Sequence, residues 1–396
     1  MRGKTVPGPI KVVHLSSVHP ADDIRIFWKE CVSLVRAGYE VVFIVPEKSA
    51  STGTRSRENI KIIPVSRHSG RLGRMLLTVA AVTAVALRQN ADVYHFHDPE
   101  LIPCGLLLRA LGKRVIYDAH EDLPRSLANR EWIPRSLRSP IALTASAVGW
   151  IADRALSGVV AATPVIARRF RENRVTVVQN FAHRSEFLDT TNPAEPGRYT
   201  VAYVGAVVPS RSAVEMVDAM TKIDRYPGVR LLIAGDISPE PLAARLEASA
   251  GWQRVDYRGR QDRAGVRRIL AEARVGLALY HPVQAHMDCL PTKIFEYMAA
   301  GLPVIAADFP GFRRIVEDNR CGLCVPPCDV AAIASAIEWI FDNPAEAQAM
   351  GCRGREAALN SFSWDSEEQA LLRLYGRVTA GLGRAQTVQG RPTTAH

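Results

Sequence analysis

The residues with the clearest chemical potential lie in one stretch of the chain, 281–308. Two carboxylates, Asp288 and Glu296, stand there with a lysine, Lys293, between them. We expect a short helix to begin at Pro291, because proline favours the first helical turn. Lys293 and the free N–H groups at this helix start suit an anionic phosphate group, whereas the two carboxylates suit hydroxyl groups.

This set of side chains would suit a sugar nucleotide, with cations for its diphosphate and carboxylates for hydroxyl groups at both ends. A second basic residue supports the same interpretation. Arg211 opens a predicted helix shortly after Gly205, and a guanidinium binds phosphate through two parallel hydrogen bonds. Arg260 follows another predicted strand, where a base or ribose would lie. The plainer alternative is an ordinary loop–helix–strand with a buried lysine and a surface arginine.

The segment 291–306, PTKIFEYMAAGLPVIA, resembles the signature of glycosyltransferase family 4, a family of retaining enzymes with the GT-B fold. Its form is that of the branch that assembles bacterial polysaccharides and lipid-linked glycans. The chain departs from the family pattern in two places. The first acid is Asp288, where the family has glutamate, and the residues 289–293 replace a glycine-rich turn.

The resemblance implies a role for each residue of the motif. Arg211 and Lys293 would clamp the diphosphate, Glu296 would hold the ribose, and Asp288 would hold the sugar. The residues expected to bind the donor are Gly205, Arg211, Arg260, Asp288, Leu290, Pro291, Thr292, Lys293 and Glu296.

Polar residues also follow predicted strands in the first half of the chain. The runs 93–100, VYHFHDPE, and 115–122, VIYDAHED, each pass from apolar residues to histidine and acid. Such residues lie on the ligand side of a parallel sheet. By resemblance, His120 contacts the transferred sugar. The residues expected on the acceptor side are His19, Asp22, Asp23, Arg25, His97, Asp98 and His120, and the catalytic set is His120, Arg211, Asp288, Lys293 and Glu296. The alternative for Asp22 or Asp23 is a plain helix N-cap.

Strands and helices alternate in both halves of the chain, which predicts two α/β domains of the Rossmann type. The resemblance implies the GT-B arrangement, in which these domains face each other across a cleft and a C-terminal helix crosses back to the first. We expect domains at 1–185 and 186–362, a crossing helix at 363–380 and a disordered tail at 381–396.

The expected reaction is the transfer of a hexosyl group from a nucleoside diphosphate sugar, UDP or GDP being the favoured carriers, with retention at the anomeric carbon. The acceptor would be a glycan or a polyprenyl-diphosphate-linked glycan. We expect no cofactor and no metal, because the chain has no D-x-D motif. Two alternatives stay open: a sugar-nucleotide 2-epimerase of the same architecture, and a non-catalytic binder of anionic ligands.

Charge is unevenly distributed along the chain. Residues 1–180 carry 26 Lys and Arg against 15 Asp and Glu, whereas residues 181–396 carry 24 against 25. A basic first half favours an anionic partner such as a membrane surface. Nucleic acid is disfavoured, because no recognisable reading motif accompanies the charge. The sequence shows neither a secretion signal nor a run of 18 apolar residues, so we expect a cytoplasmic protein, at most peripheral on the inner face of the plasma membrane.

Three further segments allow two interpretations each. Residues 71–88 predict a helix that is either buried in the domain or interfacial, and 124–140 predict a surface loop that is either mobile and lipid-touching or merely solvated. The cysteines Cys321, Cys324, Cys328 and Cys352 favour buried thiols over a metal site, because a second closely spaced pair is missing.

Overall fold

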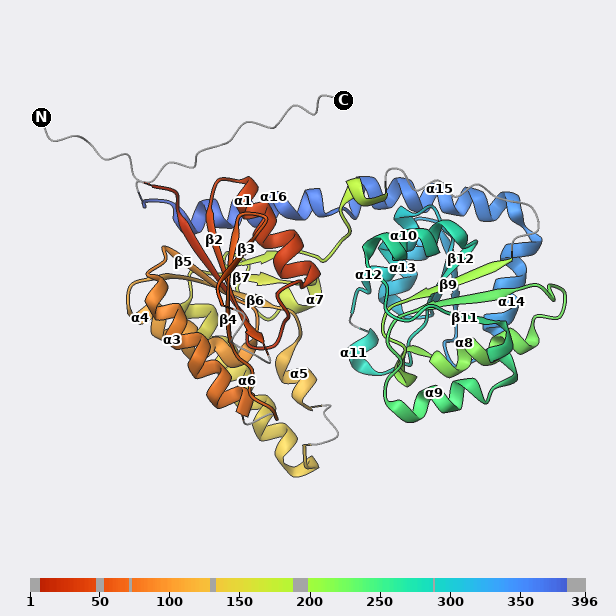
Figure 1. Ribbon diagram of the computed structural model, residues 1–396, viewed down its shortest axis with the longest axis horizontal. Helices are drawn as coiled ribbons and strands as arrows, with labels where there is room; N and C mark the ends of the chain where they lie inside the picture. The colour runs from red at the N-terminus through yellow and green to blue at the C-terminus, as the bar shows by residue number, and fades with distance from the viewer. Residues whose placement is uncertain are drawn as a thin grey trace, which may run out of the picture. The chain divides into compact units, whose positions relative to one another are not determined.

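The computed structural model describes residues 8–47, 53–70, 73–128, 133–187, 199–287 and 289–382, which form two compact units (Figure 1). Unit 1 contains the chain up to Asn180 together with the segment from Glu367 onward. Unit 2 is the continuous stretch Phe181–Ser366. Most of the predicted tail, from residue 383 onward, lies outside the described residues.

Unit 1 is built on an eight-stranded sheet with the order β3-β4-β2-β1-β5-β6-β7-β8. Every neighbouring pair is parallel except β3 and β4. The chain starts at β1 and builds the sheet outward in both directions, so the strand order reverses between β1 and β5. The strands are β1 (Lys11–Leu15), β2 (Glu40–Glu47), β3 (Arg55–Arg57), β4 (Ile60–Ser66), β5 (Val93–Phe96), β6 (Arg114–Ala119), β7 (Gly158–Ala161) and β8 (Val175–Val177).

Helices cover both faces of this sheet, and Figure 1 shows α3, α4 and α6 on one of them. Successive residues of a strand point to opposite faces. Val13 and Leu15 of β1 therefore join the apolar core under α3 and α4, whereas His14 points to the other face, toward α16. The helices are η1 (Ile24–Cys31), α1 (Val32–Arg36), η3 (Arg74–Thr78), α3 (Val79–Gln89), η4 (Pro99–Leu101), α4 (Ile102–Ala110), α5 (Leu123–Ala128), α6 (Arg135–Ala155), α7 (Pro164–Ala167) and α16 (Trp364–Thr379).

Two segments of unit 1 differ from the sequence prediction. The expected surface loop at 124–140 is wrong, because its described residues belong largely to α5 and α6. Its prolines suggested a loop, but Pro124 lies in the first turn of α5 and Pro134 is the N-cap of α6, positions that helices accept. The predicted helix at 71–88 exists from residue 73 onward, but full burial is wrong because Met75, Leu76 and Leu77 are more than half exposed.

Unit 2 is built on a six-stranded parallel sheet with the order β11-β10-β9-β12-β13-β14, which reverses between β9 and β12. The strands are β9 (Thr200–Val204), β10 (Arg230–Ala234), β11 (Val255–Tyr257), β12 (Val275–Ala278), β13 (Val304–Ala307) and β14 (Gly322–Val325). The helices are η5 (Arg184–Phe187), η6 (Pro209–Arg211), α8 (Ala213–Ala219), η7 (Met220–Lys222), α9 (Glu240–Glu247), η8 (Ala250–Arg254), α10 (Arg263–Glu272), α11 (Gln284–Met287), α12 (Thr292–Ala299), α13 (Pro310–Asp318), α14 (Val330–Asp342) and α15 (Pro344–Ser361).

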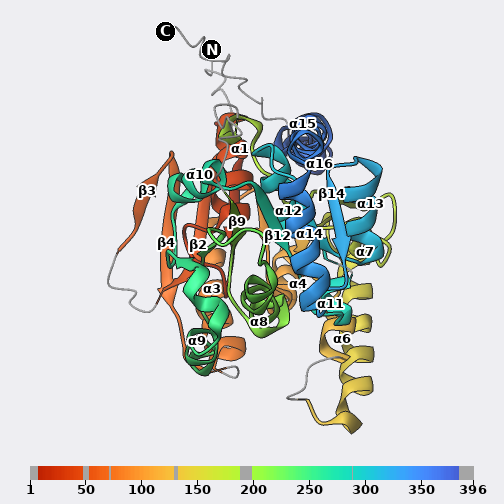
Figure 2. The same ribbon diagram turned by 90° about the vertical axis from the view of Figure 1, so that its right-hand side faces the viewer.

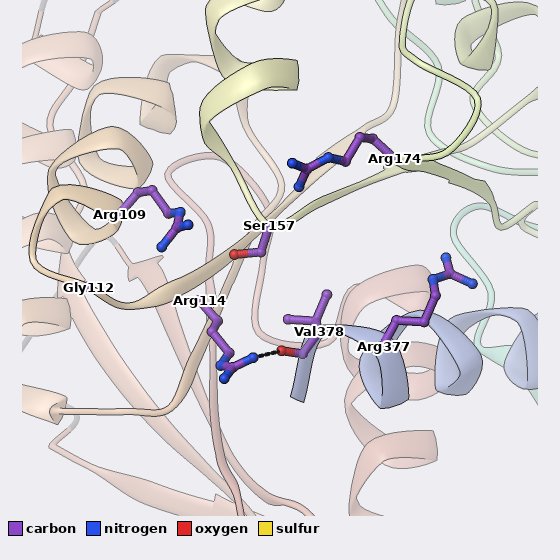
Figure 3. Close-up of a pocket in the computed structure, with 7 residues that line it drawn as sticks. All are labelled: Arg109, Gly112, Arg114, Ser157, Arg174, Arg377 and Val378. Atoms are coloured by element: carbon purple, nitrogen blue, oxygen red, sulfur yellow. Dashed lines mark hydrogen bonds between the residues drawn. The ribbon is translucent and has the colours of Figure 1, made fainter. Parts of the chain in front are cut away.

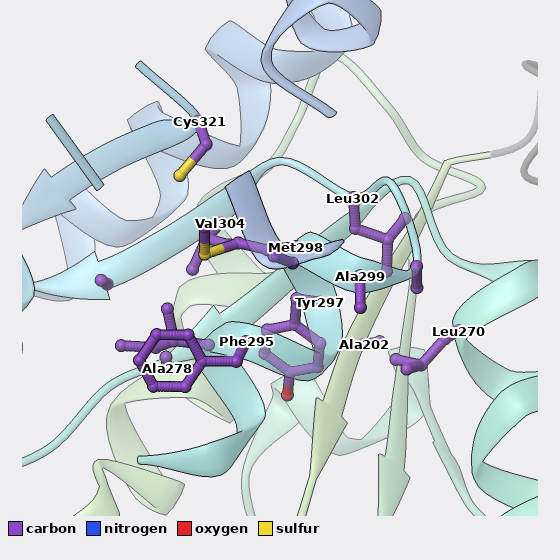
Figure 4. Close-up of a cluster of buried hydrophobic side chains, with 14 of the residues drawn as sticks. Ala202, Leu270, Ala278, Phe295, Tyr297, Met298, Ala299, Leu302, Val304 and Cys321 are labelled. Carbon is purple, nitrogen blue, oxygen red and sulfur yellow. The ribbon is translucent and has the colours of Figure 1, made fainter. Parts of the chain in front are cut away.

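The sheet of unit 2 separates two apolar cores. In β9, Ala202 faces the core under α10 and α12, and Tyr203 faces the core under α8 and α14. Figure 2 shows α8 beside α14, and these helices are in contact. The core under α12 is drawn in Figure 4, where Tyr297 lies among apolar side chains of the strands. Its hydroxyl donates to the carbonyl of Leu277 at 3.2 Å and accepts from the N–H of Val204 at 3.0 Å, which fixes α12 to the sheet.

No described helix is both long enough and apolar enough to cross a lipid bilayer.

We predict that Gly276→Ala destabilises unit 2, because the added methyl group would stand 2.4 Å from the Tyr297 ring. Overpacking of this kind costs about 1–3 kcal/mol. The matched control is Gly228→Ala, which places a methyl group where no heavy atom lies within 4 Å. Urea unfolding should show a lower midpoint for Gly276→Ala and an unchanged midpoint for Gly228→Ala. Equal midpoints would contradict the close packing of α12 on β12.

Candidate functional site

The candidate residues of both units lie where parallel strands end, close to the points at which the strand order reverses. Such positions bind ligands in open α/β sheets. In unit 2, Gly205 follows β9 directly, and α12 lies in the connection from β12 to β13. In unit 1, His97 follows β5 and His120 follows β6.

Two predicted cations of unit 2, Lys293 and Arg211, converge on the backbone of Gly205. A Cβ atom built on Gly205 would lie 3.5 Å from Lys293 Nζ and 3.6 Å from an Arg211 guanidinium nitrogen. Gly205 has φ of +122°, a conformation that favours glycine. The turn therefore brings these two basic side chains together over bare backbone, and their role as a diphosphate clamp stays a prediction.

Lys293 is buried, and its amino group has no hydrogen-bond partner among the described residues. The residue is 6% exposed, and within the described part of the chain no acceptor lies in hydrogen-bonding geometry to Nζ. The ammonium group lies 3.6 Å from the centre of the Tyr203 ring and 5.5 Å from that of Tyr280, so aromatic faces supply its nearest favourable contacts. Burial, followed by the charge of Arg211, lowers the pKa of Lys293 well below its usual value. An anion at this position would offset both the cost of burying the ammonium group and its repulsion by Arg211.

The loop that carries Arg211 is held by residues that the sequence analysis did not single out. The N–H of His281, beyond the end of β12, donates to the carbonyl of Ser210 at 2.9 Å. The Nε2 atom of His281 lies 2.8 Å from Glu215 Oε1 on α8. These bonds tie the loop after β9 to the loop after β12, and this brings Arg211 and the residues before α12 to the same end of the sheet.

Glu296 is held by an arginine that the sequence analysis missed. Arg263, the first residue of α10, donates from NH1 to Glu296 Oε1 at 2.7 Å and from Nε to Glu186. Although burial lowers the pKa of Arg263, the two carboxylates raise it above its usual value. Arg263 opens a helix after strand β11, the position that could have identified it. Arg260, the arginine predicted from the sequence, is exposed in the loop before this helix.

The remaining donor-side residues surround the start of α12. Pro291 is its N-cap and is buried, and Leu290 packs against the core. Thr292 is half-buried. Asp288 lies outside the described residues, so its predicted role stays a prediction.

A buried ion pair between Arg25 and Asp118 lies at the centre of the unit 1 residues. Arg25 donates to both carboxylate oxygens of Asp118, at 3.1 and 3.0 Å, and to the carbonyl of Val178 at 2.8 Å. Burial alone would raise the pKa of Asp118, but the Arg25 charge and the neighbouring histidines hold it well below its usual range. Asp118 is thus a permanent anion at the end of β6.

Two predicted histidines contact this carboxylate. His97 Nδ1 forms a hydrogen bond with Asp118 Oδ2 at 3.2 Å. His120 Nε2 lies 2.9 Å from the same oxygen, but not in hydrogen-bonding alignment, and His120 is partly exposed. The structure therefore places both histidines beside one anion, as their positions after neighbouring strands predicted.

The loop after β1 adds His19 and Asp23 to this group, and the loop after β5 adds Asp98. Asp98 accepts from the hydroxyl of Ser16 at 2.8 Å and from the N–H of Ser17 at 2.7 Å, and it lies 3.5 Å from His19. Burial would raise the pKa of Asp23, but its hydrogen bond with His19 and the N–H of Ile26 lower it to about 2.

Only one of the two adjacent acids belongs to this group. Asp23 is the N-cap of η1, accepting from the N–H groups of Arg25 and Ile26. Asp22 is exposed, and no described contact joins it to the other residues, so its place on the acceptor side stays a prediction.

A second layer of buried polar residues behind His97 was not anticipated from the sequence. His14 Nδ1 lies 2.9 Å from His97 Nε2, and the hydroxyl of Tyr375 on α16 lies 3.3 Å from His14 Nε2 and 2.9 Å from His95 Nδ1. Burial lowers the pKa of His14, His95 and His97, so they are neutral hydrogen-bonding groups near pH 7. These contacts link α16 through two histidines to Asp118.

Among the described residues, three groups bring possible metal-ligating atoms within 4.8 Å of one another. In each group, ligand atoms already contact one another or Arg25, so side chains of the protein meet their polar needs in part. Of the four cysteines considered from the sequence, Cys328 belongs to one of these groups, and the other three belong to none of them. The groups are His14, Glu30, His95 and His97; His97, Asp118 and His120; and Glu215, His281 and Cys328.

Comparison with known proteins identifies a family for each half of the chain. Residues 28–185 match the family described as Glycosyltransferase Family 4, and residues 198–343 match the one described as Glycosyl transferases group 1. The phosphatidyl-myo-inositol mannosyltransferase of Mycobacterium leprae is 28% identical over 189 residues, which are 47% of this chain and 49% of that protein. The D-inositol 3-phosphate glycosyltransferase of Mycobacterium avium is 30% identical over 183 residues, 45% and 41% of the two chains. The matched region spans about half the length of these curated relatives.

Solved structures share the fold over almost the whole chain. The sucrose-phosphate synthase of Thermosynechococcus elongatus has a TM-score of 0.74 at 19% identity and covers 94% of this chain and 99% of its own. Anabaena HepE, solved in complex with UDP, has a TM-score of 0.69 at 15% identity, with 93% and 99% covered. The predicted GT-B fold is confirmed. With a family match on each half and this fold throughout, the chain belongs to glycosyltransferase family 4.

Proposed function

We propose that this protein transfers a hexosyl group from a nucleoside diphosphate sugar to a glycan or lipid-linked acceptor, with retention of configuration. The observation that carries the proposal is Lys293, a buried amino group that has no hydrogen-bond acceptor among the described residues and converges with Arg211 on Gly205. A buried cation left without an anion is costly, so a site built around one favours an anionic ligand.

The chemistry of transfer explains why the charge is kept unpaired. When the bond between sugar and diphosphate breaks, negative charge grows on the departing diphosphate. Cations that are already in place stabilise this charge without reorganisation. Arg211 contributes a planar guanidinium suited to two phosphate oxygens, and Lys293 contributes a point charge. Because these two residues and the start of α12 supply this stabilisation, we propose a reaction that needs no metal ion.

The nucleoside would be held by the Glu296 and Arg263 pair. Arg263 occupies one oxygen of the Glu296 carboxylate and holds the side chain in place. A carboxylate oriented in this way can accept hydrogen bonds from the two hydroxyl groups of a ribose. The HepE structure contains UDP, and another structure of that protein contains UDP-glucose. UDP and GDP are therefore the first carriers to test.

Unit 1 offers an apolar pocket beside its candidate residues. The pocket has a volume of about 630 Å³, and Glu121, the neighbour of His120, is part of its lining. Most other lining side chains are apolar, among them Leu123, Ile141 and Val148. The exposed Met75 also lines the pocket, and the exposed Leu76 and Leu77 follow it in the sequence. We propose that this region receives the apolar part of a lipid-linked acceptor and touches an anionic membrane surface.

The donor nucleotide can be identified by thermal unfolding of the protein with UDP-, GDP-, ADP- and TDP-sugars. A ligand present at about 100 times its dissociation constant should add about 2.7 kcal/mol of stability. In Lys293→Met the affinity should fall by about tenfold to about a hundredfold, because a charged hydrogen bond is lost. The control Lys222→Met removes an exposed lysine of η7 and should bind normally. Unchanged affinity in Lys293→Met would contradict the clamp.

Donor binding should be coupled to uptake of a proton. Burial and Arg211 lower the pKa of Lys293 in the free protein, and a bound diphosphate favours the charged ammonium and so raises that pKa. The affinity should therefore fall as the pH rises through the pKa of the free protein. Calorimetry in buffers of different ionisation enthalpy counts the protons taken up. The uptake should vanish in Lys293→Met, and equal uptake in both proteins would assign it to another group.

The reaction class is decided by whether turnover needs an acceptor. With the identified donor and a lipid-linked or soluble glycan, we expect release of the nucleoside diphosphate and a product of the same anomeric configuration, read by NMR. Turnover should persist in EDTA. Formation of the 2-epimer of the sugar without any acceptor would instead identify an epimerase. Complete loss of turnover in EDTA, restored by a divalent ion, would contradict the metal-independent mechanism.

A further inference from the structure

A cationic pocket lies in unit 1, at the ends of the strands opposite to those that carry the candidate site residues. It has a volume of about 340 Å³ and is drawn in Figure 3. Arg114 begins β6, and Ser157 and Arg174 immediately precede β7 and β8. The pocket therefore opens at the amino ends of these parallel strands, whereas His120 follows the carboxyl end of β6. The lining is completed by Arg109 and Gly112 at the end of α4 and by Arg377 and Val378 of α16.

Four arginines line this pocket, and within the described residues none of them forms an ion pair. Their partners are uncharged oxygen atoms. Arg109 donates to the carbonyl of Ala155 at 3.0 Å, Arg174 to that of Leu156 at 3.2 Å, and Arg377 to the hydroxyl of Thr176 at 2.8 Å. Arg114 donates to the carbonyls of Val378 and Ala380.

These contacts explain how the guanidinium groups are held, but they do not neutralise them. Two of the acceptors, Ala155 and Leu156, lie at the end of α6, where a helix dipole supplies about half a negative charge. Four full positive charges thus face, at most, a fraction of one opposing charge. Each guanidinium has five N–H donors and spends only a few of them on these contacts. Figure 3 shows Arg109 and Arg174 on either side of Ser157, whose hydroxyl adds a further polar group.

A pocket of this size lies at the small end of the range that holds small ligands, about 300–1,000 Å³. Guanidinium groups match phosphate oxygens in geometry as well as in charge, because they form paired hydrogen bonds. Apolar side chains are almost absent from the lining, which disfavours a hydrophobic ligand. We propose that the pocket of Arg109, Arg114, Arg174 and Arg377 is a binding site for a phosphate-bearing anion, separate from the donor site.

Two kinds of molecule carry a phosphate group that these arginines would recognise. It belongs either to a free phosphate or diphosphate in solution, or to the headgroup of an anionic phospholipid. Binding to lipid is tested separately because two leucines near the lining residue Arg109 in the sequence are exposed. They are Leu107 in α4 and Leu111 at its C-cap. An exposed apolar turn beside basic residues suits the surface of a bilayer.

The test uses the full chain carrying Lys293→Met, so that the donor-site clamp contributes less to phosphate binding. Binding of inorganic pyrophosphate is measured by calorimetry, and binding to vesicles of phosphatidylcholine with or without phosphatidylglycerol is measured by sedimentation. The variant is Arg109→Gln/Arg377→Gln, two exposed positions whose replacement leaves the buried core intact. The matched control is Arg245→Gln/Arg268→Gln, which removes the same charge from exposed positions in unit 2.

We expect the pocket variant to bind its anion at least about tenfold more weakly than the control. Pyrophosphate binding that weakens in this way identifies a soluble phosphate compound. Vesicle binding that requires phosphatidylglycerol and weakens only in the pocket variant identifies a lipid headgroup. Equal binding by the pocket variant and the control in both arms, or no binding in either arm, overturns the proposal. The pocket variant and the control carry the same weakened donor site, so a difference between them does not bear on the proposed transferase reaction.

Discussion

The organisation of unit 1 depends on the buried ion pair between Arg25 and Asp118. A buried pair contributes little net stability when it forms, because both charges must leave water, but removing one partner costs about 3–5 kcal/mol. Here the pair has a second consequence. Arg25 joins η1, strand β6 and the backbone after β8, so three segments distant in sequence are fixed at one point. The anion that remains on Asp118 then orients His97 and stands beside His120.

Unit 2 handles buried charge in the opposite way. Glu296 is satisfied by Arg263, but Lys293 lies beside aromatic rings and finds no acceptor in the described part of the chain. Packing in the rest of the unit offsets the free-energy cost of burying Lys293. The two apolar cores and the hydrogen bonds of Tyr297 hold α12 in place. In unit 1 the central charges of Arg25 and Asp118 neutralise each other and are held in place. In unit 2 Lys293 stays available for an anionic ligand. This contrast is what a binding step for an anion requires, since the energy of neutralisation is released only when the ligand arrives.

The sequence predicted what is local and missed what is distant. The spacing of Lys293 and Glu296 within one helix, and the polar residues after β5 and β6, follow from periodicity and turn residues, and the structure brings them where expected. Arg263 reaches Glu296 across 33 residues, and Tyr375 reaches His14 across 361 residues. No pattern along the chain encodes such pairs, because they depend on how strands order themselves in the sheet. The helices at 123–128 and 135–155 were missed for a local reason, namely prolines that start helices as readily as they mark loops.

The division of the chain also sets an order in which its parts can be completed during synthesis. Domains usually fold as units, beginning with the N-terminal one. Unit 2 is continuous and is complete once Ser366 has been made. Unit 1 begins first but finishes last, because α16 supplies Tyr375 to its buried histidines and the carbonyl of Val378 to Arg114. Until that helix leaves the ribosome, the histidine face of the first sheet lacks the part of its cover that α16 supplies, and the nascent chain carries a finished second unit and an unfinished first one.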